Sequence, residues 1–217
     1  MQNNNLLKKA MLALLLCMAM PCVNAQMAHI GDILCEGDLI VSPANYNANT
    51  HTAIGVVFYV DQTGQHGWAV ALQDAGSYKW AYKSNAYYVG EYVYDTPLPN
   101  YDNNRSAVYD LDGYENTGTI RSEYFPAFYA VDYENGWYLP AIGQWNYLYG
   151  NLVEVNASLL IAGGSKISGW EYWSSSEYSW TLAWHINSSG DLRHDQTTHS
   201  FNNNKDVDRT VRAARNF

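Results

Sequence analysis

Histidine and carboxylate side chains, the groups best suited to metal binding or acid–base chemistry, gather towards the C-terminal end of this sequence. The residues concerned are His185, His194, His199, Asp191, Asp195, Asp206 and Asp208. Imidazole and carboxylate ligands are common in zinc sites, so a metal centre has to be considered. Their spacing matches no compact ligand motif, however, and a solvated polar loop has the same composition. We therefore expect no metal ion and no other cofactor.

Three consecutive serines, Ser174 to Ser176, could supply a nucleophile beside a histidine and an aspartate. No Gly-x-Ser-x-Gly turn surrounds them, and serines that follow a strand more often bond to nearby backbone groups. We expect these serines to be structural and the protein not to be an enzyme. An undetected hydrolase is the least favoured alternative.

The composition favours a single domain. The chain has 217 residues, of which 47% are apolar and 15% aromatic, enough for one well-filled core. Its formal charge of −9 argues against nucleic acid as a partner, because binding to phosphates requires a basic surface.

The first 25 residues have the pattern of a signal peptide. Lys8 and Lys9 precede an apolar run that is too short to cross a bilayer. We expect cleavage after Ala25, export to the medium or the cell surface, and no transmembrane span in the mature chain. Lipidation at Cys17 or Cys22 is the alternative. After cleavage at Ala25, residues 26–217 would form one domain that begins with an extension at 26–50. Of the three cysteines, only Cys35 would remain in that mature chain.

Apolar periodicity predicts strands at both ends of the domain. Residues 52–61 and 66–74 predict a β-hairpin. The first run is rich in β-branched and aromatic residues, Trp68, Val70 and Leu72 alternate with smaller residues in the second, and a short turn joins the two. Residues 180–187 alternate between large apolar and smaller side chains, which indicates a half-buried strand followed by a Ser-Ser-Gly-Asp turn. We expect Trp145, Trp173 and Trp184 in the core.

Helices are expected between these strands. Pro126 and Pro140 suit the first turns of two helices, and Gly163 and Gly164 end a further helical stretch that starts at about residue 153. Residues 75–113 lack any sustained period and predict long loops with one or two short strands. The tyrosines from Tyr78 to Tyr101 make these loops a second candidate contact surface.

The order of several motifs resembles a known superfamily. The series "AIGVVFYVD", "HGWAVAL", "GWYLPAIGQWNYLY", "YWSSSE", "AWHIN" and "VRAARNF" is similar to bacterial exported domains of the C-type-lectin-like superfamily, over roughly residues 50–217. Those domains include the C-terminal domain of collagen-like surface proteins and the major-paralogous-domain family. Ala141 and Gln144 depart from the usual helix-cap residues.

The resemblance implies an α+β, C-type-lectin-like fold. It would consist of a twisted, mostly antiparallel sheet with a few helices, long loops on a ligand-facing side, and neighbouring N- and C-terminal strands. The final "TVRAARNF" would be the closing strand. Calcium-dependent sugar binding is not expected, because the acidic residues that coordinate calcium in such lectins are missing from "LPN" and "WHI".

The tail also resembles the variable proteins of diversity-generating retroelements. In these proteins a reverse transcriptase rewrites adenines in Asn-rich codons, while framework positions stay fixed. The matching framework positions are Trp173 to Glu177, Ala183, Trp184, Gly190, Lys205, Val211, Arg212 and Arg215. The positions resembling the rewritten set are His185, Asn187, Ser189, Asp191, Arg193, His194, Asp195, Thr197, Thr198, His199, Asn202 to Asn204, Asp206, Asp208 and Thr210.

Residues 178–210 are therefore predicted to form a recognition surface that binds a protein or a carbohydrate in an adhesin-like role. The predicted contact residues are Tyr178, Ser179, Trp180, Thr181, His185, Asn187, Ser189, Asp191, Arg193, His194, Asp195, Thr197, His199, Asn203, Asp206, Asp208 and Thr210. Tyr and Trp give a large contact area, and the short polar side chains give adaptable hydrogen bonds. The alternative is a structural subunit of a surface or pilus-like assembly, in which the tail is only a solvated face.

Overall fold

The computed structural model describes residues 27–82, 96–168, 171–193 and 205–217. Three sequence predictions lie outside these residues: the signal peptide, the central part of the Tyr-rich loops, and the contact residues His194, Asp195, Thr197, His199 and Asn203.

The first sheet contains the predicted hairpin. Its strand order is β2 (Leu39–Val41), β1 (Ile33–Cys35), β3 (Ala53–Val60), β4 (Gly67–Ala71), β11 (Ala214–Asn216) and β6 (Trp137–Tyr138), and every neighbouring pair is antiparallel. Val56 lies opposite Val70, which confirms the hairpin. The N- and C-terminal strands share this sheet, with β3 and β4 between β1 and β11.

The second sheet contains the strands that the structure describes within the predicted recognition segment. Its order is β5 (Gly76–Lys79), β10 (Asp208–Val211), β7 (Tyr172–Ser179), β8 (Leu182–Ile186) and β9 (Leu192–Arg193). The pairs are antiparallel except for one parallel bridge between Thr210 and Tyr172.

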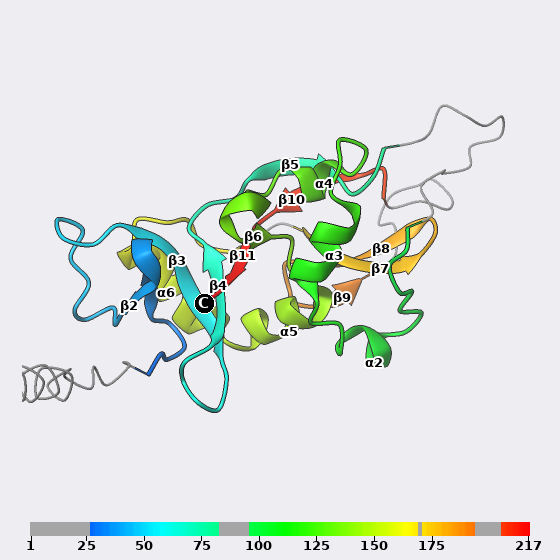
Figure 1. The fold of residues 1–217 in the computed structure, drawn as a ribbon. Helices are drawn as coiled ribbons and strands as arrows, with labels where there is room; N and C mark the ends of the chain where they lie inside the picture. The colour runs from blue at the N-terminus through cyan, green and yellow to red at the C-terminus, as the bar shows by residue number, and fades with distance from the viewer. Residues whose placement is uncertain (1–26, 83–95, 169–170, 194–204) are drawn as a thin grey trace, which may run out of the picture.

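Two chain segments pass from one sheet to the other side by side. β4 leads into β5 and β10 leads into β11, so that the two pairs β4·β11 and β5·β10 join the sheets (Figure 1). The prediction of one sheet with one closing strand is wrong, since residues 208–216 form two strands in two sheets.

Arg212 occupies the bend between β10 and β11 and is fully buried. Its guanidinium donates to the carbonyl oxygens of Ala71, Leu72 and Ser165, to the Ser165 hydroxyl and to the Asp74 carboxylate, at 2.7–3.0 Å. These bonds satisfy the carbonyls that the strands expose where they change sheets, which the planar guanidinium can do and a single ammonium cannot.

The described part of the chain contains five α-helices: α2 (Asn104–Ala107), α3 (Gly113–Ile120), α4 (Pro126–Tyr129), α5 (Ile142–Gly150) and α6 (Leu152–Ile161), with short 3₁₀ turns η1 (Glu36–Asp38) and η2 (Tyr133–Asn135). Pro126 stands in the first turn of α4, as predicted, while α5 begins two residues after Pro140. The Gln144 side chain accepts the N–H of Ala141, so the departure from the usual cap residues leaves one cap bond in place. Gly163 ends α6 with a φ of +78°.

Apolar side chains pack on both faces of the second sheet. Trp184 and Ile186 belong to a core shared with Val56 and Val70 of the first sheet. On the other face, Trp173 and Ala183 pack with side chains from the loops and from α4. Trp145, Trp173 and Trp184 are fully buried, which confirms their predicted place in the core.

The α+β class is confirmed, with two mostly antiparallel sheets. The finer, C-type-lectin-like assignment stays a prediction. No helix within the described ranges is long and apolar enough to cross a membrane.

Candidate functional site

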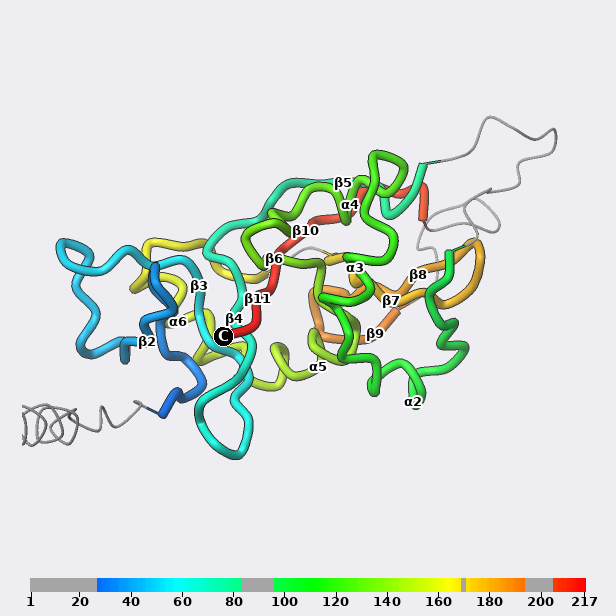
Figure 2. Tube along the Cα trace, viewed as in Figure 1, coloured from blue at the N-terminus to red at the C-terminus, as the bar shows by residue number. Residues whose placement is uncertain are grey.

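Several of the predicted contact residues lie at the two ends of the β7–β8 hairpin, whereas Asp206, Asp208 and Thr210 lie in the last segment of the chain. Tyr178 and Ser179 end β7, and Trp180 and Thr181 form the turn to β8; the Trp180 side chain is about half exposed, at 52%. Asn187, Ser189 and Asp191 form the turn at the opposite end, before Arg193 in β9. Figure 2 shows these two turns well apart, so the residues do not form one continuous patch.

His185 is not a surface residue, contrary to the prediction. Its side chain is fully buried, with its ring edge-on to Trp173 at 5.8 Å and its Nε2 3.8 Å from the Glu171 carboxylate. The strand predicted at 180–187 is present as β8, but its predicted half-burial is wrong. Apolar layers cover both faces of β8, and Ala183, Trp184, His185 and Ile186 are all buried.

The serine triplet is built into the core. The Ser174 hydroxyl donates to the carbonyl of Trp184 at 2.7 Å, and the Ser176 hydroxyl donates to the Asp110 carboxylate at 2.6 Å. Ser175 accepts from the Asn116 side chain in α3. Burial raises the pKa of the Asp110 carboxyl, although the hydrogen bond from Ser176 and others act against it.

Lys205 fixes the start of the last segment of the chain. Its ammonium pairs with Glu177, which also accepts the Thr96 hydroxyl, and both charged side chains are almost fully buried. The Lys205 ammonium lies 4.4 Å from the centre of the Trp80 ring and donates to the Trp180 carbonyl. We call Lys205 and Glu177 the buried ion pair.

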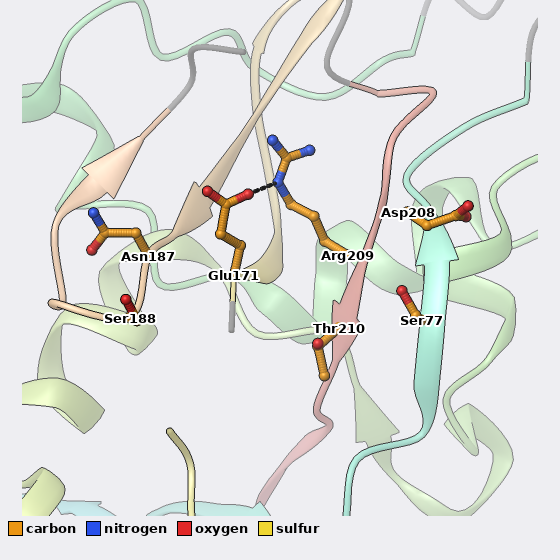
Figure 3. Close-up of a pocket in the computed structure, with 7 residues that line it drawn as sticks. All are labelled: Ser77, Glu171, Asn187, Ser188, Asp208, Arg209 and Thr210. Atoms are coloured by element: carbon orange, nitrogen blue, oxygen red, sulfur yellow. Dashed lines mark hydrogen bonds and ion pairs between the residues drawn. The ribbon is translucent and has the colours of Figure 1, made fainter. Parts of the chain in front are cut away.

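A groove of about 520 Å³ opens on the second sheet, next to β10. We call it the β10 groove. The residues that line it are Ser77, Glu171, Asn187, Ser188, Asp208, Arg209 and Thr210 (Figure 3). They come from β5, from the residue before β7, from the β8–β9 turn and from β10. The side chains that line it are all polar or charged.

Contacts with Glu171 and Trp173 hold Arg209 and Thr210 of the groove in position. The Arg209 Nε donates to Glu171 at 2.8 Å (Figure 3). The guanidinium carbon lies 4.4 Å from the centre of the Trp173 ring. The Thr210 N–H donates to the Glu171 carbonyl. Strand pairing between Thr210 and Ser77 fixes β5 beside β10 on one side of the groove.

The β8–β9 turn is equally well fixed. The Asn187 side chain accepts the N–H groups of Ser189 and Asp191 and donates to the Asp191 carboxylate. Gly190 has a φ of +83°, and a Cβ there would lie 2.7 Å from the Tyr149 ring, so only glycine fits. Asn187 and Ser188 therefore face the groove from a preformed turn.

Four lining residues have side-chain groups free for a ligand. In the part of the chain that the structure describes, the side chains of Ser77, Ser188, Asp208 and Thr210 make no hydrogen bond or ion pair with the protein. Three hydroxyls and one carboxylate in the lining are thus available for a ligand.

Part of this site was predicted from the sequence. Asn187, Asp208 and Thr210 were predicted contact residues and line the groove, with Ser189, Asp191 and Arg193 exposed in the adjoining turn and strand. Asp206 lies outside the groove, paired with Lys79 at 3.2 Å. Ser77, Glu171, Ser188 and Arg209 were missed. Ser188 carried a signal, since it lies inside the predicted segment, whereas Ser77 is brought in only by long-range strand pairing.

Among the described residues, no three His, Cys, Asp or Glu side chains come together in a way that could hold a metal ion. His194, Asp195 and His199 lie outside the described residues.

The comparisons with known proteins concern the fold. No protein family model matches the sequence, and no curated protein matches it. The structure is similar to the crystal structure of a fimbrial protein from Bacteroides ovatus ATCC 8483, with a TM-score of 0.58 and 19% sequence identity. The match covers 87% of this chain and 49% of that one, so this chain spans about half the length of the fimbrial protein.

Proposed function

We propose that this chain is a non-enzymatic, exported domain of a fimbria-like assembly at the cell surface. The observation that carries the proposal is the likeness to a fimbrial protein over 87% of the chain. It favours the assembly alternative over a free-standing binding protein.

An exposed apolar stripe on α6 supports this proposal. Val153 is 85% exposed, and Leu160 and Ile161 are about half exposed, at 53% and 51%. They lie seven and eight residues after Val153, hence on one helix face, while Val155 and Leu159 on the opposite face are buried. Apolar side chains grouped on a surface are typical of contact with another protein, and a neighbouring subunit would pack here.

The experiment is filament fractionation. In the cells that encode the chain, sheared surface filaments should contain it as high-mass species. Leu160→Glu together with Ile161→Glu should deplete it from that fraction while leaving its circular dichroism unchanged. The matched control is Tyr109→Glu, at a side chain that is 81% exposed on another face of the fold. This variant should leave the amount of the chain in the filament fraction unchanged. A chain found only as a free monomer would overturn the proposal.

A second candidate function is recognition by the exposed residues of 178–210, in which an adhesin-like domain is diversified by a retroelement. It is supported by how the two sets of tail positions differ in burial. All fixed positions except Gly190 and Arg215 are buried, whereas the rewritten positions within the described ranges are exposed or half-buried, with His185 as the exception.

The gene neighbourhood tests this candidate. A reverse-transcriptase gene beside a near-copy of the region coding for the tail should be present. The copies should differ only at template adenines, in codons such as those for Asn187, Asp191 and Asp208, and not in the codon for Lys205. A neighbourhood without such a copy would remove the diversified version.

A further inference from the structure

We propose that the β10 groove binds a neutral saccharide directly, without a metal ion. This inference rests on the second candidate function, recognition by the tail surface, and is independent of the assembly role.

The lining of the groove selects for a polar ligand. All seven lining side chains are polar or charged, so an apolar ligand would cover hydrogen-bonding groups and satisfy none of them. The volume of about 520 Å³ lies within the range usual for small-molecule sites, roughly 300–1,000 Å³. A small, hydrogen-bonding molecule therefore fits the groove best.

The charges of the groove favour a neutral ligand. Glu171 is neutralised by Arg209 at 2.8 Å, which leaves Asp208 as the carboxylate that the protein does not pair. An anionic ligand would be repelled by that carboxylate. A single ammonium group would satisfy Asp208 but not the hydroxyls of Ser77, Ser188 and Thr210.

Several ligand hydroxyls would satisfy every free group of the groove. A carboxylate only accepts hydrogen bonds, while Ser and Thr hydroxyls both donate and accept. A sugar ring presents hydroxyls that can do both, spread over a few ångströms. Asp208, Thr210 and Ser77 lie on two paired strands, and Ser188 lies across the groove from them (Figure 3).

The groove is already formed without a ligand. Stacking on Trp173 and the bond to Glu171 hold Arg209, and backbone hydrogen bonds hold Asn187 and the turn. Binding would thus order few side chains, which lowers its entropic cost.

The test uses the purified full chain and an immobilised panel of neutral oligosaccharides of two to four rings, with polylysine as a cationic comparator. At least one oligosaccharide should bind, with an affinity unaffected by EDTA and nearly constant between low and high NaCl, because the ligand carries no charge. Thr210→Val and Asp208→Asn should each weaken binding at least fivefold.

Matched controls keep the result interpretable. Thr52→Val removes an exposed hydroxyl, and Glu36→Gln neutralises an exposed carboxylate, both beside the first sheet, and neither should change binding. Thermal unfolding of every variant checks that the fold is intact. Ser77→Ala, a smaller change, serves if Thr210→Val does not fold.

Three results would overturn the inference. They are binding by no oligosaccharide, binding that the groove variants leave unchanged, or binding abolished by EDTA. Binding of polylysine alone, lost at high salt and in Asp208→Asn, would make the groove a cation site instead. In that case only the saccharide proposal would be wrong, and recognition by the tail would remain supported. Diversification by a retroelement is tested separately, by the gene neighbourhood.

Discussion

Buried charges hold the second sheet and its groove in position. Lys205 pairs with Glu177, and Arg209 pairs with Glu171 while its guanidinium stacks on Trp173. A buried charge is tolerated only where its partner is present, because removing the partner leaves the desolvation cost unopposed. These residues therefore specify the arrangement of the tail even where they add little net stability.

Removing the ammonium of the buried ion pair should destabilise the protein strongly. Lys205→Met is expected to lower the free energy of unfolding by about 3 kcal/mol, since the Glu177 carboxylate loses its charged partner. The double change Lys205→Met with Glu177→Gln should recover part of the loss. Urea unfolding of both variants measures this. A loss below about 1 kcal/mol for the single variant, as for an exposed pair, would contradict the expectation.

Asp110 should make stability depend on pH in the acidic range. Burial raises the pKa of its carboxyl above the usual 3.8, so the folded protein keeps this proton to a higher pH than the unfolded chain. Its contribution to stability is complete below the unfolded pKa and is lost as pH rises through the folded pKa. As pH rises from below 3.8 through the raised pKa of the folded state, the wild type should therefore lose stability relative to Asp110→Asn. Urea unfolding at several pH values tests this, and a constant difference would refute it.

At the scale of elements, the bend between β10 and β11 depends on Arg212. Arg212→Lys should lower the free energy of unfolding by about 2–4 kcal/mol, because a single ammonium leaves at least two buried acceptors unsatisfied. Arg215→Lys is the control, since Arg215 pairs with Asp38 at a partly exposed site, and should cost no more than about 0.5 kcal/mol. Chemical denaturation of the two variants distinguishes them, and equal losses would show that the bend does not depend on the guanidinium.

Local elements could be predicted from the sequence, whereas their assembly could not. The β3–β4 hairpin and the start of α4 follow from apolar alternation and from Pro126, which act over a few residues. The bend after Val211 interrupts no local sequence pattern, so residues 210–217 were predicted to form a single strand. The alternating pattern of residues 180–187 predicted that His185 is exposed, because such a pattern implies that one face of the strand contacts solvent. In the structure a second apolar layer covers that face. Ser77 reaches the groove through a partner far along the chain.

At the scale of the whole molecule, the two sheets should unfold together. One apolar core contains Val56 and Val70 of the first sheet and Tyr172 and Trp184 of the second, so neither sheet keeps its packing without the other. Urea transitions followed by tryptophan fluorescence and by far-ultraviolet circular dichroism should therefore coincide. Two separated transitions would mean that the sheets are independent units.

The position of β11 within the first sheet has a consequence for the rate of folding. Residues 214–216 pair with β4 and β6, which lie roughly 145 and 77 residues earlier in the chain. Contacts so distant in sequence form slowly, because a long loop must close first. Until they form, β4 and β6 each expose an unpaired edge that a second chain can occupy. Refolding at high protein concentration should therefore compete with pairing between molecules, and dilution should raise the yield.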